Sequence, residues 1–272
     1  MAKGGPVRPK WLMAVVLLGA CGTNAVVTPP PGQTTAAPST TLLVQPPTTI
    51  AVSSTVEVLT ALPYQWPDDL TEVAGFWAPL QVTGGFEILR FRTLEELAES
   101  ATVVVIAVAV GPGPSATIGG DPDNNEVSTA RSLIVEVREV VRTRTHLLGI
   151  HTPDLGEHIA VIMDHQPRTA ISTIPVLLFL QAPGDDRYYF RVPPDQIAPE
   201  YRDYYIETLE AWEAFRAGKY RPLNSQSLLV GDGATTVSPW VSANADPLSS
   251  YISGVPIAEI VDLIRSMPPP EA

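Results

Sequence analysis

Apolar residues form short runs along the chain from about residue 93 onward, and their spacing predicts strands. Residues 102–110 are apolar or β-branched at both odd and even positions, which is typical of a strand buried on both faces. In residues 133–138, Leu133, Val135 and Val137 alternate with Ile134, Glu136 and Arg138. This alternation predicts a half-exposed strand. The same reasoning predicts further strands at 158–163, 176–180, 188–192, 228–230 and 234–237.

Turn-forming residues connect two pairs of these strands. The segment 182–186 contains Pro183 and Gly184 and predicts a hairpin between 176–180 and 188–192. Gly-Asp-Gly at 231–233 predicts a second hairpin between the last two strands. By contrast, residues 111–126 are rich in Gly, Pro, Asp and Asn, so we expect a loop there.

Three segments carry the apolar spacing of an amphipathic helix. In the first, Thr93 and Glu96 form a capping-box pattern, in which the Thr93 hydroxyl accepts from the Glu96 amide. The second runs from Pro199, which suits the first turn of a helix, to Gly218, which suits its end. The third covers 256–267.

These elements predict a mainly β domain of the α+β class. Short strands separated by turns, with helices at the edges, favour a small closed or partly closed β-barrel over residues 93–267. Short helices would lie at its periphery, with an inserted helix near 199–218 and a C-terminal helix. A parallel α/β sheet is disfavoured because it needs helices between successive strands. We expect residues 62–92 to be an irregular lead-in that packs aromatic rings on the core, and residues 268–272 a disordered tail.

The first twenty residues have the three parts of a secretory leader. A basic start with Lys3, Arg8 and Lys10 is followed by an apolar core and by small residues at the expected cleavage point. The apolar core has about ten residues, which is too short to cross a hydrocarbon layer about 30 Å thick. The sequence therefore predicts export.

Residues 18–21, Leu-Gly-Ala-Cys, resemble the lipobox of exported bacterial lipoproteins. The resemblance implies cleavage between Ala20 and Cys21 and a thioether from the Cys21 sulfur to diacylglycerol. Two or more acyl chains give a stable anchor, so the implied location is the extracytoplasmic face of the cell membrane. The alternatives are an ordinary signal peptide followed by an accidental cysteine, and a short membrane anchor.

Residues 21–61 are expected to form a disordered stalk anchored at Cys21. The segment repeats Thr, Pro, Ala, Ser and Val, and Glu57 is its only charged residue. Such a composition buries too little apolar surface to offset chain entropy. The ends of a flexible chain of about 40 residues lie on the order of 35 Å apart, which would hold the folded domain clear of the membrane.

Charge and cysteine content restrict the possible partners. The formal net charge is −12, and loss of the three leader cations would change it to −15. An acidic chain lacks the basic patch that phosphate backbones require, which argues against nucleic acid as a partner. A single cysteine allows neither an intramolecular disulfide nor a thiolate metal cluster.

The four histidines lie close together in the sequence, at His146, His151, His158 and His165. Neutral imidazole binds zinc and copper, so metal capture is one interpretation. If residues 158–165 are extended at about 3.3 Å per residue, His158 and His165 lie more than about 20 Å apart and on opposite faces. Only His146 and His158 would then approach each other, across a hairpin base. The competing interpretation is a set of surface histidines, and no other cofactor is expected.

No catalytic residue is assigned from the sequence. The nucleophile motifs Gly-x-Ser-x-Gly and Ser-x-x-Lys, the zinc motif His-Glu-x-x-His and a glycine-rich phosphate loop are all absent. Tyr201, Tyr204 and Tyr205 form a candidate binding surface, because tyrosine-rich surfaces suit contacts with sugars or proteins. The alternative is that this helix packs its aromatic rings over the barrel mouth.

Four core patterns follow one another in a familiar order: a helix leading into a strand at 93–111, strands at 137–143 and 176–180, and a final helix at 256–265. In this order they resemble a family of exported lipoproteins of high-GC Gram-positive bacteria with an OB-type β-barrel domain. The resemblance covers residues 90–267. It implies the fold and the compartment, and the family carries no assigned activity.

The sequence therefore favours a lipid-anchored extracytoplasmic lipoprotein that is a non-enzymatic binding or envelope-assembly module. Its expected partners are the membrane, through the lipid anchor, and an envelope protein or a glycan. One alternative is a cell-envelope hydrolase of glycan or peptidoglycan, which paired carboxylates in a concave pocket or a buried His–Asp pair would favour. Another is a weak metal binder that uses residues 146–165.

Overall fold

The protein is described by a computed structural model. It covers residue 61 and residues 63–80, 90–121, 126–144, 150–163, 172–188, 191–241 and 246–269. All of these residues belong to one compact unit, Val56–Ala272. The predicted leader, Ala20 and Cys21 at the cleavage point, and the stalk lie outside the described residues, apart from Ala61.

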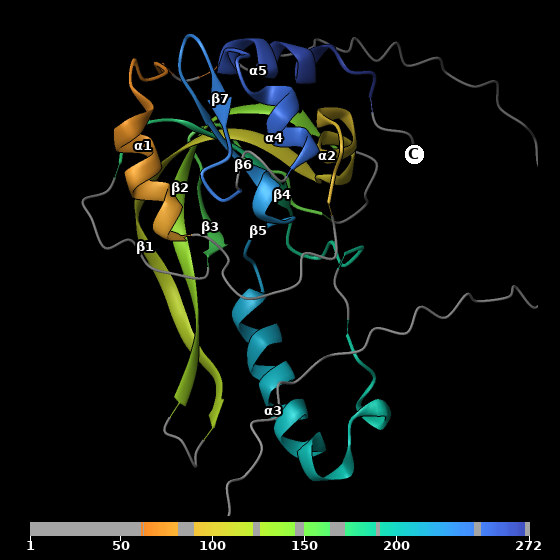
Figure 1. Cartoon of the computed structure of the whole chain (residues 1–272). Helices are drawn as coiled ribbons and strands as arrows, with labels where there is room; N and C mark the ends of the chain where they lie inside the picture. The colour runs from red at the N-terminus through yellow and green to blue at the C-terminus, as the bar shows by residue number, and fades with distance from the viewer. Residues whose placement is uncertain are drawn as a thin grey trace, which may run out of the picture. The chain divides into compact units, whose positions relative to one another are not determined.

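The described residues form a mainly β domain of the α+β class, built on one seven-stranded sheet (Figure 1). The strands are β1 (Val103–Asp121), β2 (Glu126–Thr143), β3 (His158–Met163), β4 (Val176–Gln181), β5 (Arg221–Pro222), β6 (Leu228–Gly231) and β7 (Thr236–Val237). Their order is β3-β2-β1-β4-β6-β7, with β5 paired to β4, and these pairs are antiparallel.

The path of strand pairs is open, with β3 at one edge and β7 at the other. One parallel bridge, between Val161 and Tyr220, joins β3 to the residue before β5. The Tyr220 amide donates to the Ala160 carbonyl at 2.9 Å, and the Ile162 amide donates to the Tyr220 carbonyl at 2.9 Å. The edge strand β3 is therefore hydrogen-bonded on both sides at this point.

The segment predicted as a loop at 111–126 is mostly a β-hairpin arm, because β1 continues to Asp121 and β2 begins at Glu126. The two strands stay paired past Pro112 and Pro114 through register shifts, one of them between Pro112 and Ser115. Bulges of this kind let a strand accommodate prolines, which cannot donate to the ladder. The loop prediction failed because the composition does not reveal these shifts.

The hairpin predicted between 176–180 and 188–192 does not form in the described residues. β4 pairs instead with β1, β5 and β6. The chain turns after β4, where the Asp185 amide donates to the Ala182 carbonyl at 3.1 Å. The second predicted hairpin is confirmed as β6–β7, with Val230 opposite Val237.

The three predicted helices are confirmed as α2 (Leu94–Ser100), α3 (Pro199–Arg216) and α5 (Ile257–Ser266). At α2 the Thr93 hydroxyl accepts from the Glu96 amide at 3.2 Å, as predicted. The Glu96 carboxylate accepts from the Arg92 amide at 2.7 Å, one residue before the position expected of a capping box. Pro199 begins α3.

The lead-in is helical rather than irregular over α1 (Leu70–Trp77). Its Phe76 and Trp77 are buried in the core, so the predicted packing of aromatic rings is present. The Trp77 carbonyl accepts from the Trp240 indole at 2.8 Å, which ties the lead-in to the chain after β7. The sequence also gave no prediction of α4 (Pro247–Ile252) or of the 3₁₀ turns η1 (Ala78–Leu80), η2 (Pro194–Gln196) and η3 (Ser225–Ser227).

The sheet has a buried cluster on each face, which explains why β1 is apolar at both odd and even positions. Val103 and Val105 pack in the cluster that contains α1, whereas Val104 and Ile106 pack in the cluster that contains α2 and α5. Full burial of a side chain of this size contributes about 1.5–3 kcal/mol. Burial of its side chains on both faces of the sheet therefore fixes the position of β1.

The β1–β2 arm and α3 extend side by side away from the α2, α4 and α5 end of the sheet (Figure 1). A Cβ placed on Gly119 of β1 would lie 2.9 Å from the Tyr204 hydroxyl and 3.0 Å from the Thr208 hydroxyl of α3. A glycine at this position is therefore what allows the helix to approach the strand so closely. Among the described residues, no helix combines the length and the apolar character needed to cross a membrane.

Candidate binding site

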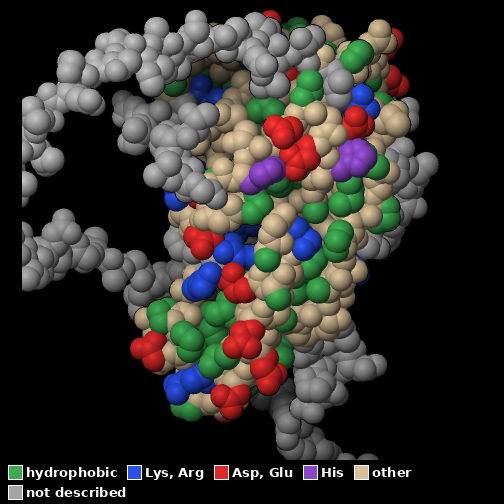
Figure 2. Space-filling view, turned by 180° about the vertical axis from the view of Figure 1, so that it is seen from behind, with side chains coloured by type: hydrophobic (Ala, Val, Ile, Leu, Met, Phe, Trp, Pro, Cys, Tyr) green, Lys and Arg blue, Asp and Glu red, His purple; other side chains and the backbone are tan. Residues whose placement is uncertain are grey.

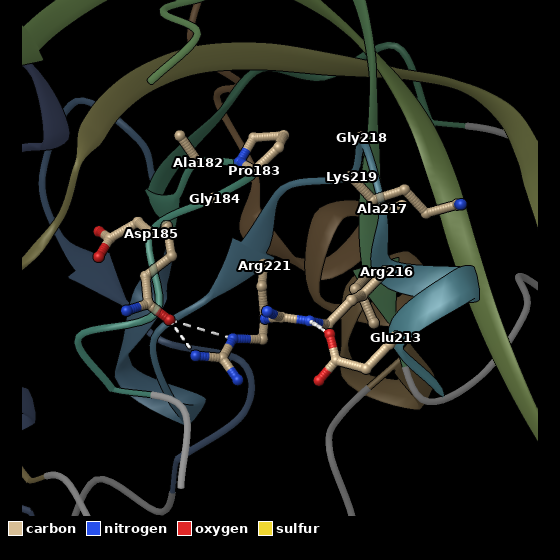
Figure 3. A pocket seen from close by; sticks show the side chains of 12 residues that line it. Ala182, Pro183, Gly184, Asp185, Glu213, Arg216, Ala217, Gly218, Lys219 and Arg221 are labelled. Carbon is tan, nitrogen blue, oxygen red and sulfur yellow. Dashed lines mark hydrogen bonds and ion pairs between the residues drawn. The ribbon is translucent and has the colours of Figure 1, made fainter. Parts of the chain in front are cut away.

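A pocket of about 220 Å³ lies where β4 ends, β5 begins and α3 terminates (Figure 3). We call it the arginine pocket. Its lining residues are Ile162, Gln181, Ala182, Pro183, Gly184, Asp185, Glu213, Arg216, Ala217, Gly218, Lys219 and Arg221. They come from three separate parts of the chain, at 162, 181–185 and 213–221, that the sheet brings together.

Gly218 directs the chain from α3 into β5, and this turn positions the basic side of the pocket. Its φ of 69° lies in the left-handed region that side chains with a Cβ avoid. The Lys219 amide donates to the Arg216 carbonyl at 3.0 Å across the turn. Arg221 follows directly in β5 and lies between the turn after β4 and the α3 side chains of Glu213 and Arg216 (Figure 3).

Gln181, the last residue of β4, is buried in the wall of the arginine pocket with 1 % of its surface exposed. Its Oε1 accepts from Arg221 Nε at 3.1 Å and also from Arg221 Nη2. Because a guanidinium can only donate, this contact fixes Oε1 toward Arg221 and turns Nε2 away from it. Gln181 Nε2 has no hydrogen-bond partner among the described residues.

Arg216 and Glu213 of α3 are engaged with each other and with neighbouring charges. Arg216 Nε donates to Glu213 Oε2 at 2.6 Å, and Arg216 Nη2 donates to the Asp186 carboxylate. Arg191 Nη2 lies 2.7 Å from Glu213 Oε1. Burial alone would lower the pKa of Arg216, but its hydrogen bonds to Asp186 and Glu213 raise that pKa on balance. The guanidinium therefore stays charged.

Asp185 forms the opposite wall of the pocket and is 5 % exposed. The Thr102 hydroxyl donates to its Oδ2, and Arg187 donates from Nη2 to Oδ2 at 2.7 Å and from Nε to Oδ1 at 2.9 Å. Burial raises the pKa of Asp185, but the hydrogen bonds from Arg187 and Thr102 outweigh it and lower the pKa overall. Asp185 is therefore an ionised, fully engaged carboxylate.

Positive charge exceeds negative charge around the arginine pocket. The basic residues at or beside it are Arg187, Arg191, Arg216, Lys219 and Arg221, and the acidic ones are Asp185, Asp186 and Glu213. The chain as a whole carries −12. On the face shown in Figure 2, Lys and Arg side chains gather near the middle, and Asp and Glu outnumber them among the charged side chains of the lower part, which lie between hydrophobic ones. The pocket is thus a local basic region on an acidic protein.

The carboxylates of the pocket are poorly suited to acid–base catalysis. A glycosidase needs one carboxylic acid that keeps its proton near neutral pH, and such an acid has a raised pKa. The pKa of Asp185 is lowered instead. Glu213 is paired with Arg191 and Arg216. Asp185 is therefore a poor candidate for the proton donor of such a reaction.

A second hollow of about 380 Å³ lies between the β1–β2 arm and α3. We call it the Trp212 groove. It is lined by Ile118, Ser128, Thr129, Ala130, Arg131, Ile162, Met163 and Trp212. The Trp212 and Phe215 rings lie 5.9 Å apart, which holds the indole against the helix. Ile162 lines both hollows, so the groove adjoins the arginine pocket there.

The tyrosines predicted as a binding surface lie on α3 but line neither hollow. Tyr201 and Tyr204 are exposed, at 53 % and 48 %. Tyr204 contacts the arm near Gly119. The Tyr205 hydroxyl donates to the Val192 carbonyl at 2.8 Å, which secures the chain before the helix. Tyr204 and Tyr205 thus contact neighbouring segments of the chain, and the binding role of the three tyrosines stays a prediction.

The histidines are only partly within the described residues, because His146 and His165 lie outside them. His158 begins β3 and is exposed. His151 Nδ1 lies 2.7 Å from the Tyr220 hydroxyl, and His151 Nε2 lies 3.7 Å from Glu157 Oε1. In the part of the chain that the structure covers, no three His, Cys, Asp or Glu side chains are grouped as metal ligands would be.

The residues of the arginine pocket were not predicted from the sequence. One signal was present: Gln181 is a polar residue that directly follows the apolar run 176–180. A polar side chain at the end of a buried strand often faces a site. The contribution of α3, whose Glu213 and Arg216 lie more than thirty positions after Gln181, has no comparable sequence signal.

A scan against protein-family models found no match, and a search of curated protein sequences found no similar protein.

Proposed function

We propose that this protein is a lipid-anchored extracytoplasmic lipoprotein whose folded domain is a non-enzymatic binding module, with the arginine pocket as its ligand site. The observation that carries the proposal is the buried Gln181 amide, which has no partner for Nε2 among the described residues and lies in a basic pocket. Buried polar groups are almost always paired. A donor without a partner in a pocket is therefore a group that a ligand would satisfy.

The proposed compartment rests on the sequence. The leader, the lipobox-like residues 18–21 and the stalk, in which Glu57 is the only charged residue, together support anchoring at Cys21. The stalk would place the domain within reach of an envelope protein or a glycan. An acidic domain with one basic pocket suits a partner that carries a localised negative charge.

We further propose that the sheet closes into an OB-like barrel. The support is the bridge between Val161 and Tyr220, which joins β3 to the β5 segment while β5 pairs with β4. In this arrangement β1, β2, β3, β5 and β4 would form a ring, as in the OB-type domains that the order of elements resembles. The β1–β2 arm and α3 would then lie at the same end of the ring.

Photo-crosslinking in cells tests the binding function. A photoreactive amino acid at Lys219 lines the arginine pocket, whereas the same amino acid at Arg92 lies at an exposed position beside α2. We expect an envelope component to be captured from position 219 and not from position 92. Capture of nothing at position 219, or of the same products from both positions, would contradict a ligand site in this pocket.

A further inference from the structure

We propose that the arginine pocket binds the carboxylate of an acidic saccharide, with the sugar ring extending into the Trp212 groove. The inference rests on the proposed function and names the class of ligand for the same site. It is carried by three features of the described residues: an unpartnered amide donor, the charge balance of the lining, and the chemistry of the adjoining groove.

Two buried glutamines show what is unusual about the pocket. Gln181 and Gln226 are each 1 % exposed. Gln226 Nε2 donates to the Phe91 carbonyl at 2.8 Å and to Asp246 Oδ1 at 2.7 Å. Gln181 Nε2 has no such partner in the part of the chain that the structure describes. Leaving a buried donor unsatisfied costs about 1–3 kcal/mol, so we expect the ligand to present an acceptor to Nε2.

The neighbours of Gln181 select an anionic acceptor. Arg221, which orients the Gln181 amide, and Arg216 both line the same pocket. A carboxylate satisfies an amide N–H and a neighbouring guanidinium together, because each of its oxygens accepts more than one hydrogen bond. A neutral hydroxyl would satisfy Nε2 but would gain nothing from the positive charge.

The charge of the lining favours a carboxylate over a phosphate. Three basic residues, Arg216, Lys219 and Arg221, line the pocket with two acidic residues, Asp185 and Glu213. The lining residues alone carry one net positive charge, which matches the single negative charge of a carboxylate. Arg187, Arg191 and Asp186 lie beside the pocket, where they are paired with Asp185, Glu213 and Arg216. A phosphate monoester carries about −1.5 to −2 at neutral pH and would leave negative charge beside Asp185 and Glu213.

The Trp212 groove supplies contacts for a sugar ring. Trp212 presents an indole beside the hydroxyls of Ser128 and Thr129. The C–H face of a saccharide packs against an aromatic ring, and its hydroxyls exchange hydrogen bonds with such side chains. The groove meets the pocket at Ile162. In the proposed pose, the carboxylate lies in the arginine pocket and the sugar ring lies on the Trp212 side of Ile162.

The test is calorimetric titration of the full chain in detergent with D-glucuronate, D-glucose and inorganic phosphate. We expect saturable binding of D-glucuronate, accompanied by a change in tryptophan fluorescence. D-Glucose and phosphate should each bind at least tenfold more weakly, because the first lacks the carboxylate and the second has the wrong charge. This comparison uses the unaltered protein, so it decides the proposal even if a variant fails to fold.

Variants locate the binding. Gln181→Glu keeps the acceptor for Arg221 and replaces the Nε2 donor with negative charge, so we expect D-glucuronate binding to weaken by tenfold or more. Arg92→Gln removes an exposed charge beside α2 and should leave binding unchanged.

Equal binding of glucose, tighter binding of phosphate, absence of D-glucuronate binding or an unaffected Gln181→Glu variant would each overturn the carboxylate assignment. The crosslink from position 219 tests the pocket separately. If it succeeds while D-glucuronate fails to bind, the binding function stands and only the ligand class is wrong.

Discussion

Asp185 connects the turn after β4 to the residue that precedes β1. Thr102 and Arg187 donate to its carboxylate, and Arg187 Nη2 also donates to the Ser100 carbonyl at 3.2 Å. One buried carboxylate thereby fixes the wall of the arginine pocket to the end of α2. The same donors that hold Asp185 in place keep it ionised. Its role is structural and electrostatic.

Replacing Asp185 with Asn should destabilise the protein in a pH-dependent way. The pKa of Asp185 in the folded protein lies below its ordinary value of 3.8. Its charge therefore stabilises the fold above that value, and this stabilisation is lost as the pH falls through the lower folded pKa. We expect Asp185→Asn to lower the free energy of unfolding at pH 7 by about 1–3 kcal/mol.

Urea unfolding of both proteins between pH 7 and pH 3 measures this effect. The difference between the wild type and Asp185→Asn should shrink toward the acidic end. Asp262→Asn is the matched control, because Asp262 pairs with Arg265 at an exposed site and surface pairs contribute little. A difference that does not vary with pH would show that the charge of Asp185 is unimportant.

The β1–β2 arm and α3 depend on each other at the level of elements. Two antiparallel strands alone are marginally stable in water, and α3 buries only Phe215 among its own residues. Ala116 and Ile118 of the arm pack with Phe215 and Trp212 of the helix. The contact between the two elements therefore shapes the Trp212 groove.

Gly119→Val should separate α3 from the arm, because its Cβ would lie within 3.0 Å of the Tyr204 and Thr208 hydroxyls. Overpacking of this kind costs about 1–3 kcal/mol. We expect faster hydrogen exchange of the α3 amides. Gly111→Val is the control in the same strand, since a Cβ at Gly111 meets nothing within 4 Å. Equal exchange in both variants would show that the close approach is unimportant.

The elements that the sequence predicted well are those whose signals are local. Residues 102–110 are apolar on both parities, and the Thr93 cap and Pro199 mark helix starts that the structure confirms. The hairpin arm beyond Gly111 was missed because strand pairing, not composition, keeps Pro112 and Pro114 in β1. Local propensity is a weak guide wherever partners decide the conformation.

The candidate site escaped prediction for the same reason. Gln181, Asp185, Glu213 and Arg221 lie in different elements, and only the pairing of β4 with β5 and the turn at Gly218 bring them together. The predicted tyrosines share one helix and are local in sequence, and their binding role stays a prediction. The spacing of apolar residues predicted α3, but it could not show which face of this helix borders a pocket.

At the scale of the whole molecule, Cys21 should determine where the protein resides. We expect Cys21→Ser to release the protein from the membrane fraction into the medium, because a serine cannot form the thioether. Ser39→Ala in the predicted stalk keeps Cys21 and should remain in the membrane fraction. Fractionation with immunodetection measures both. A Cys21→Ser protein that stays membrane-bound would contradict lipid anchoring.

The hydrogen bond between Trp77 and Trp240 joins residues that are 163 positions apart in the chain. Synthesis proceeds from the N-terminus, so Trp77 becomes available long before its partner. Contacts across so long a separation form late, because they require a large loop to close first. The lead-in helix therefore gains this contact only after Trp240 has been synthesised, so α1 is fixed in place late in folding.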